Sequence, residues 1–273
     1  MEIFSKKAPL EKELERLERQ EQRLAERRAD KKESRLNQLL ADKVPEQLQH
    51  TLNTAFSKAF WLIFEKGTSI IEKICKRDEL EKAYRVNEYA AKIHNNRKTL
   101  RAFSKKAGSS GTKNLVLSGV SGIGLGILGI GIPDIVLFTG LMLKGIYEIA
   151  LNYGFAYETE SERQFILYLI QGAVSCGEQY QAAEHQIDGY IRSGQFSEQL
   201  SMEELIEQTA RCLSGELLYM KFLQGIPIVG AVGGAYDAIY MKQVIEFSEL
   251  KYRCRFYLQK QFQADGADET PSA

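Results

Sequence analysis

Four carboxylates stand inside apolar segments of the chain, where acid–base chemistry could occur. They are Asp134, Glu148, Asp237 and Glu246. Two of them could meet as a general acid and a general base, and this leaves a hydrolase with buried carboxylates as one alternative. Lys144 and Lys242 lie close enough in sequence to neutralise such groups, so ion pairing is favoured over catalysis.

The thiols and imidazoles have no spacing typical of a metal site. Cysteines occur at Cys75, Cys176, Cys212 and Cys254, and histidines at His50, His94 and His185. No C-x-x-C pair is present, and a zinc site needs clustered ligands. Cys176 also lacks a companion motif for a nucleophile. We therefore predict buried free thiols, a surface histidine at position 185, and no metal or cofactor.

A glycine-rich run, "SGVSGIGLGILGIGIPD" at residues 118–134, invites comparison with phosphate-binding loops. Gly124, Gly126 and Gly129 satisfy G-x-G-x-x-G. A dinucleotide fold also needs alternating strands and helices and an acidic residue about 20 positions later. Here helix follows helix, and no Gly-Lys-Ser/Thr ends the run. Nucleotide binding is therefore not predicted.

The spacing of these small residues favours helix packing instead. Steps of three, four and three residues place glycines on one helix face, where each costs about 1 kcal/mol relative to alanine. Close approach of two helix backbones can compensate for this cost. A second small-residue segment begins with Gly-Ile-Pro, the same three residues with which the first one ends. The predicted seam of this glycine-faced hairpin comprises Gly119, Gly122, Gly126, Gly129, Pro133, Gly230 and Gly234.

The elements around these residues are predicted to be helices, because no alternating strand pattern occurs. We expect helices ending near Gly67, from Pro133 to about Leu151, from near Ser161 to 189–194, from Ser201 to Leu223, and finally to about Gln261. Capping boxes are expected at Asp78, Thr159 and Ser201. The fold class is all-α: a multi-helix bundle with the glycine-rich hairpin in its core. We divide the chain into a charged helical arm (1–44), the bundle (45–261) and a disordered tail (262–273).

The N-terminal arm carries an incomplete heptad pattern. Leucines recur at heptad spacing from Leu10 to Leu24, but Glu21 and Arg28 interrupt the seam. We therefore predict a mostly solvated arm, with docking on a partner as the alternative. The first twenty residues are charged throughout, without an apolar signal core, and this indicates a cytoplasmic protein.

Charge is distributed unevenly, although the formal net charge is zero. No acidic residue occurs between Glu88 and Asp134, an interval with seven basic residues: Lys92, Arg97, Lys98, Arg101, Lys105, Lys106 and Lys113. A basic helix that leads into an apolar segment suits an anionic lipid surface. Few aromatic residues lie among these charges, so nucleic acid is not an expected partner.

The uncharged stretch 115–133 is long enough to cross a bilayer at 1.5 Å per residue. Glycine and serine dilute its hydrophobicity, however, and Asp134 would lie at the deep tip of an inserted hairpin. A hairpin buried in the protein core is favoured, with shallow insertion as the alternative.

Two longer phrases resemble the EcsC family. They are "GIGIPDIVLFTGLMLKGIYEIALNYGFAYETESERQFILYLI" and "GIPIVGAVGGAYDAIYMKQVIEFSELKYRCRFYL". The resemblance covers residues 50–260 approximately and leaves out the arm and the tail. Asp237 stands where that family would be expected to carry an amide. The resemblance implies a bacterial helical protein linked to an ABC transporter, with no catalytic residues to carry over.

From these features we expect a non-enzymatic accessory protein at the cytoplasmic membrane face. Its partners would be an anionic membrane surface or a membrane transporter complex, contacted through residues 92–113. A soluble carrier of a lipid or another apolar ligand is an alternative. The sequence indicates no oligomeric state.

Overall fold

The computed structural model describes residues 9–29, 46–67, 132–223 and 234–268. These residues form seven α-helices and one π-helical turn, which are α1 (Pro9–Ala29), α3 (Glu46–Leu62), η1 (Ile63–Gly67), α7 (Ile132–Asn152), α8 (Glu160–Val174), α9 (Gly177–Ser193), α10 (Met202–Leu223) and α11 (Gly234–Asp268). Within these ranges no residue is in a strand, so the predicted all-α bundle is confirmed there.

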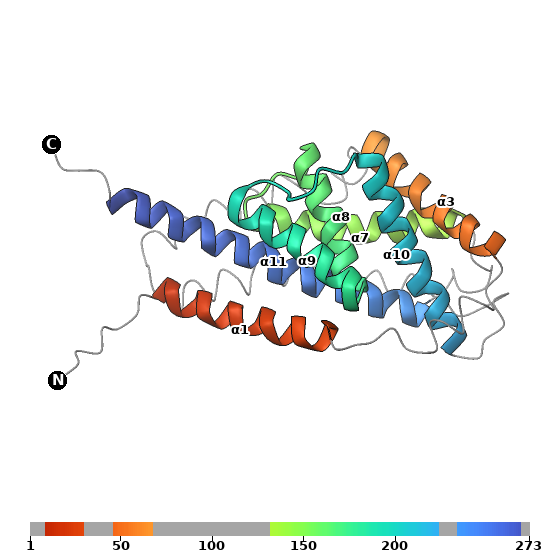
Figure 1. Cartoon of the computed structure of the whole chain (residues 1–273). Helices are drawn as coiled ribbons and strands as arrows, with labels where there is room; N and C mark the ends of the chain where they lie inside the picture. Colours follow the sequence, from red (N-terminus) through yellow and green to blue (C-terminus); the bar gives the residue numbers. More distant parts are fainter. Residues whose placement is uncertain (1–8, 30–45, 68–131, 224–233, 269–273) are drawn as a thin grey trace.

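Helix α11 is the central element of the bundle. It contacts α1, α7, α8 and α9, and it runs along most of the length of the molecule (Figure 1). Buried apolar side chains cover most of its circumference, among them Val244, Leu250 and Tyr257, whereas Lys242 and Glu246 are exposed. A helix with so broad an apolar surface must be enclosed by other elements. A charged residue on its enclosed sides therefore needs a partner inside the protein.

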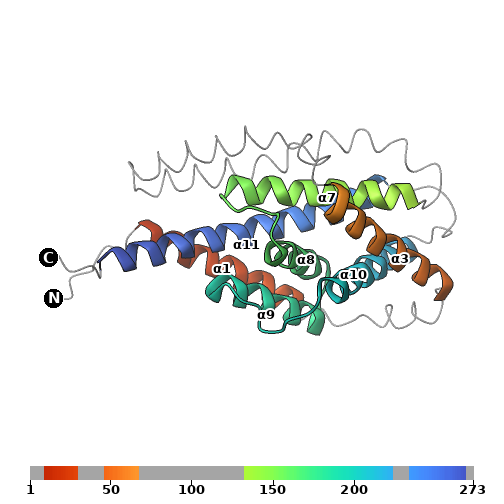
Figure 2. The same ribbon diagram turned by 90° about the horizontal axis from the view of Figure 1, so that it is seen from above.

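The other helices enclose α11 from different sides. Figure 2 shows α7 on one side of α11 and α9 with α1 on the other. Helix α8 packs against α9, α10 and α11, while α3 packs between α10 and α7. Stacked rings of Tyr147 and Tyr157, with centroids 4.1 Å apart, fix the turn after α7. One continuous hydrophobic core results.

Most predicted helix boundaries agree with the structure, including the end at Gly67 and the helix over 133–151. The prediction of one helix from Ser161 past Tyr180 is wrong, because the chain breaks between Val174 and Gly177. Cys176 is extended, and Gly177 has a φ of 61°, a conformation that favours glycine.

The last helix is longer than predicted. It continues to Asp268, whereas the sequence suggested an end near Gln261 and a disordered tail. The tail begins "FQADGAD", and its polarity is compatible with a solvated helix end as well as with a coil.

Two of the three predicted capping boxes lie in the described residues. At Ser201 the box is complete: Glu204 Oε2 accepts from the Ser201 backbone N at 2.9 Å, and Ser201 Oγ accepts from the Glu204 N at 3.2 Å. At Thr159 only the hydroxyl takes part, accepting from the Glu162 N at 3.2 Å. The Glu162 carboxylate instead points into the core.

Candidate functional site

The charged arm is docked onto the bundle along one face, while most of its residues stay exposed or half-buried. Helix α1 contacts α9 and α11, with Leu14 and Leu17 buried. Leu10 and Leu24 are partly buried against the same core. The heptad seam therefore faces the bundle, and its two polar positions, Glu21 and Arg28, face it too.

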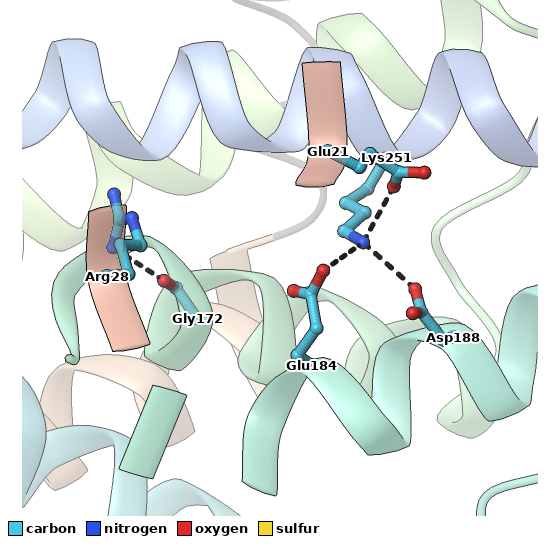
Figure 3. Close-up of polar contacts among 6 residues, drawn as sticks. All are labelled: Glu21, Arg28, Gly172, Glu184, Asp188 and Lys251. Atoms are coloured by element: carbon cyan, nitrogen blue, oxygen red, sulfur yellow. Dashed lines mark hydrogen bonds and ion pairs between the residues drawn. The ribbon is translucent and has the colours of Figure 1, made fainter. Parts of the chain in front are cut away.

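Glu21 takes part in a buried charge cluster around Lys251 of α11, shown in Figure 3. The Lys251 side chain is 1% exposed. Its Nζ lies 2.7 Å from Glu21 Oε1, 2.6 Å from Glu184 Oε1 and 2.9 Å from Asp188 Oδ1. Glu184 and Asp188 are four residues apart on α9, so they occupy one helix face. Three helices are thus joined at one ammonium group.

The electrostatics of this cluster favour a permanently charged lysine. Burial opposes the charge of Lys251, but the carboxylates of Glu21, Glu184 and Asp188 outweigh it and raise its pKa well above the ordinary value. Burial raises the pKa of Glu184, and the charge of Lys251 partly offsets this rise. The cluster holds three carboxylates and one cation, and Glu21 and Asp188 keep partial contact with water.

The oxygens of Glu21, Glu184 and Asp188 lie within 4.8 Å of one another, close enough to hold a metal ion. The Lys251 ammonium lies among them and takes the position that a cation would need. These residues therefore do not fit a metal ion in this arrangement.

Arg28 makes the second polar contact of α1, at the end of α8 (Figure 3). Its Nη1 donates to the carbonyl oxygens of Gly172 at 2.7 Å and Ser175 at 3.1 Å, as well as to that of Ala173. Burial lowers the pKa of Arg28. The guanidinium also lies 5.6 Å from the Tyr180 ring centroid. Carbonyls at a helix C-terminus attract cations, so Arg28 stabilises the break after α8.

A further buried cluster lies within the bundle. Arg255 Nη1 donates to Glu162 Oε1 and Oε2 at 2.9 and 2.8 Å, and the Tyr252 hydroxyl donates to Oε1 at 2.7 Å. The guanidinium lies 4.1 Å from the centroid of Phe155 and 4.9 Å from that of Tyr190. Aromatic faces attract a desolvated cation. This cluster joins α8 to α11 and has no member from α1.

The carboxylates considered for catalysis form local ion pairs where they are described. Glu148 is buried and lies 3.8 Å from Lys144, and Glu246 is exposed and lies 3.7 Å from Lys242. The preference for ion pairing is confirmed for these two residues. The side chains of Asp134 and Asp237 lie outside the described part.

His185 is exposed, as predicted. It lines an open cavity of about 630 Å³ between α1 and α9. Three carboxylates, those of Glu26, Glu184 and Asp188, share this cavity with Arg192. Cys254 is buried, whereas Cys176 and Cys212 are partly buried, so the prediction of buried thiols is confirmed fully only for Cys254.

The predicted membrane-binding and seam residues fall mainly outside the described ranges. All seven basic residues from Lys92 to Lys113 lie there, as do Gly119 to Gly129, Gly230 and the Asp78 capping box. Pro133 is in the first turn of α7, and Gly234 begins α11. The glycine seam and its place in the core stay predictions.

Sequence reasoning missed Lys251, Glu184 and Arg255. The sequence did contain a weak indication for two of them, because Lys251 and Arg255 are four residues apart inside the apolar stretch "FSELKYRCRFYL". A charge repeated at helical spacing within a buried helix requires a partner.

No helix in the described residues is long and apolar enough to cross a membrane. The fold and its clusters define an all-α bundle built around a central helix whose buried cations, Lys251 and Arg255, are paired inside the protein. The sequence profile of the EcsC protein family matches residues 10–257, which is most of the chain, so the protein belongs to this family. The match begins within α1, and the arm is therefore part of the family's region, contrary to the narrower range expected from sequence. No curated protein and no solved structure matched the chain.

Proposed function

We propose that the protein is a non-enzymatic accessory factor that binds the anionic cytoplasmic face of a membrane. The basic interval 92–113 and the apolar residues after it would form the contact. The link to an ABC transporter rests on the family resemblance alone. The observation that carries the proposal is an exposed pair of large apolar side chains on α3, which precedes the basic interval in the sequence.

The pair is Trp61 and Leu62, at the end of α3. Their exposed fractions are 36 and 45%, while the neighbouring Phe60 and Phe64 are buried. Buried rings fix the inner face of this turn, so the tryptophan and leucine are held on the outside. Tryptophan favours the interface between membrane and water, since its ring is apolar and its N–H can bond to headgroups or water.

Charge supports the same partner. The seven basic residues begin thirty positions after Leu62, with no acidic residue between Glu88 and Asp134. Each lysine or arginine near an anionic surface contributes about 1 kcal/mol to binding. Apolar anchors and basic residues together are the two signals that stable peripheral binding requires. The ion-paired Glu148 and Glu246 give no comparable support to a hydrolase.

Trp61 is the single tryptophan of the chain, so its fluorescence reports on this site directly. We expect its emission to shift to shorter wavelength on vesicles that contain phosphatidylglycerol, and not on pure phosphatidylcholine vesicles. Brominated lipids should quench it. Changing Lys98, Arg101, Lys105 and Lys106 to Glu should weaken vesicle binding by at least about a hundredfold, given the contribution of each charge.

The matched control changes two basic residues outside the interval. Arg211 and Lys242 are both exposed, and Arg211→Glu with Lys242→Glu should leave the binding unchanged. An unshifted Trp61 emission and no sedimentation with anionic vesicles at low salt would disprove the proposal. The control reverses half as many charges as the fourfold variant, so a control that loses half as much binding free energy would show that only net charge matters.

A further inference from the structure

Helix α1 differs from the other helices in how it is held. Its buried apolar residues in the contact are Leu14 and Leu17, with Leu10, Leu24 and Ala25 partly buried beside them, whereas α8 buries an unbroken run from Phe165 to Val174. The remaining contacts of α1 are polar: Glu21 on Lys251, Arg28 on the α8 carbonyls, and Gln20 on Arg253 at 3.2 Å. The contact is thus thin in apolar area and rich in charge.

If α1 leaves, the charged groups on α1 and those on the bundle can each find another partner or water. Lys251 would keep Glu184 and Asp188, both on α9, so no buried ammonium would be left unpaired. The carbonyls of Gly172 and Ser175 lie at a helix end, where water can replace Arg28. Glu21 and Arg28 would return to water on an otherwise highly polar helix.

The Glu162–Arg255 cluster shows the opposite arrangement. Glu162 is 2% exposed and its carboxylate is bound from α11 by Arg255 and Tyr252. Separation of α8 from α11 would also expose the apolar run from Phe165 to Val174, so this pair cannot be parted without opening the core. The protein therefore contains one charged contact that can open while exposing little apolar surface and one that cannot.

From this contrast we propose that α1 is a detachable clasp. It binds the face formed by α9, α11 and the end of α8, and it leaves as a unit while the bundle stays folded. That face is a docking site for an amphipathic helix whose leucine seam carries a carboxylate and, seven residues later, an arginine. This chain's own α1 is its resident occupant.

Hydrogen exchange of the intact protein tests the clasp. In the wild type, the amides of α1 should exchange faster than those of α10, because local opening needs less free energy than global unfolding. Glu21→Gln and Arg28→Gln should each speed exchange in α1 about tenfold or more and leave α10 unchanged. The matched control is Glu18→Gln, at an exposed position on α1, which should change neither helix.

A labelled peptide of residues 9–29 tests the docking site. It should bind the Glu21→Gln/Arg28→Gln protein at least tenfold more tightly than the wild type, whose own helix competes, and a scrambled peptide should bind neither. Three results would overturn the proposal.

The first is equal exchange rates of the α1 and α10 amides in the wild type, a comparison that does not depend on any variant folding. The second is exchange that rises equally in α1 and α10 of the variants. The third is equally tight binding of the peptide to the wild type and to the Glu21→Gln/Arg28→Gln protein.

Discussion

Replacing Lys251 with methionine removes the ammonium at the junction of three helices while keeping much of the side-chain volume. The oxygens of Glu21, Glu184 and Asp188 would then lie within 4.8 Å of one another without a cation between them. Like charges at this distance repel one another, and the surrounding helices limit how far they can separate. The variant is therefore expected to be less stable than the wild type.

The size of the loss follows from the burial of the cluster. Removing one partner of a buried ion pair costs about 3–5 kcal/mol. The side chains of Glu184, Glu21 and Asp188 are 17, 23 and 42% exposed, so water can solvate them in part. We expect the lower end, about 3 kcal/mol at pH 7, which corresponds to a fall in Tm of about 6–12 °C for a chain of this size.

The dependence on pH distinguishes repulsion from lost packing. The pKa of Glu184 is raised by burial and lowered by Lys251, so removing the lysine should raise it further. A carboxyl whose folded pKa exceeds its unfolded pKa lowers stability at neutral pH, and the penalty disappears as the pH falls towards the unfolded value of about 4.3. The difference between variant and wild type should therefore narrow from pH 7 to pH 4.

Urea unfolding at pH 7, 5.5 and 4 measures this difference. Lys242→Met is the matched control on the same helix, because Lys242 and Glu246 are both exposed; it should change stability by less than about 0.5 kcal/mol. A loss below about 1 kcal/mol for Lys251→Met would refute the expected cost of an unpaired cluster. If the loss of unfolding free energy in Lys251→Met is the same at all three pH values, its cause is lost packing rather than repulsion between the carboxylates.

Two further changes test packing and the second cluster. Gly172→Ala would place a Cβ 3.0 Å from the Phe247 ring and should cost about 1–3 kcal/mol in urea unfolding, whereas Gly215→Ala has open space and should stabilise α10 by up to about 1 kcal/mol. Arg255→Lys removes the guanidinium whose Nη1 bonds both Glu162 oxygens and which lies 4.1 Å from the Phe155 ring centroid, and it should lower the unfolding free energy by about 2–4 kcal/mol; an unchanged midpoint would show that these contacts add no stability.

The arm illustrates what the sequence could and could not predict. Heptad spacing located the correct face of α1, from Leu10 to Leu24. Glu21 and Arg28 on that face indicated solvation, because a charge in a seam is normally unfavourable. Their partners, Lys251 and the end of α8, are more than 140 residues away, and no local pattern connects them.

The break after α8 was missed for a related reason. The segment "LIQGAVSCGEQYQAA" contains helix-forming residues on both sides of Ser175. A glycine at position 177 weakens a helix without ending it, so a continuous helix was the natural prediction. The guanidinium of Arg28 satisfies the carbonyls that the break leaves open, and this contact comes from another helix.

The amino-acid sequence by itself determined the all-α class, most helix ends, the local ion pairs and the family. Periodicity, helix caps and pairs four residues apart depend only on residues that are close together in the sequence. Only the tertiary structure decided that α11 is central, that Lys251 joins α1 to α9, and that Arg255 pairs with Glu162. Burial of a charge depends on which distant group neutralises it, and that group is brought near only when the helices pack.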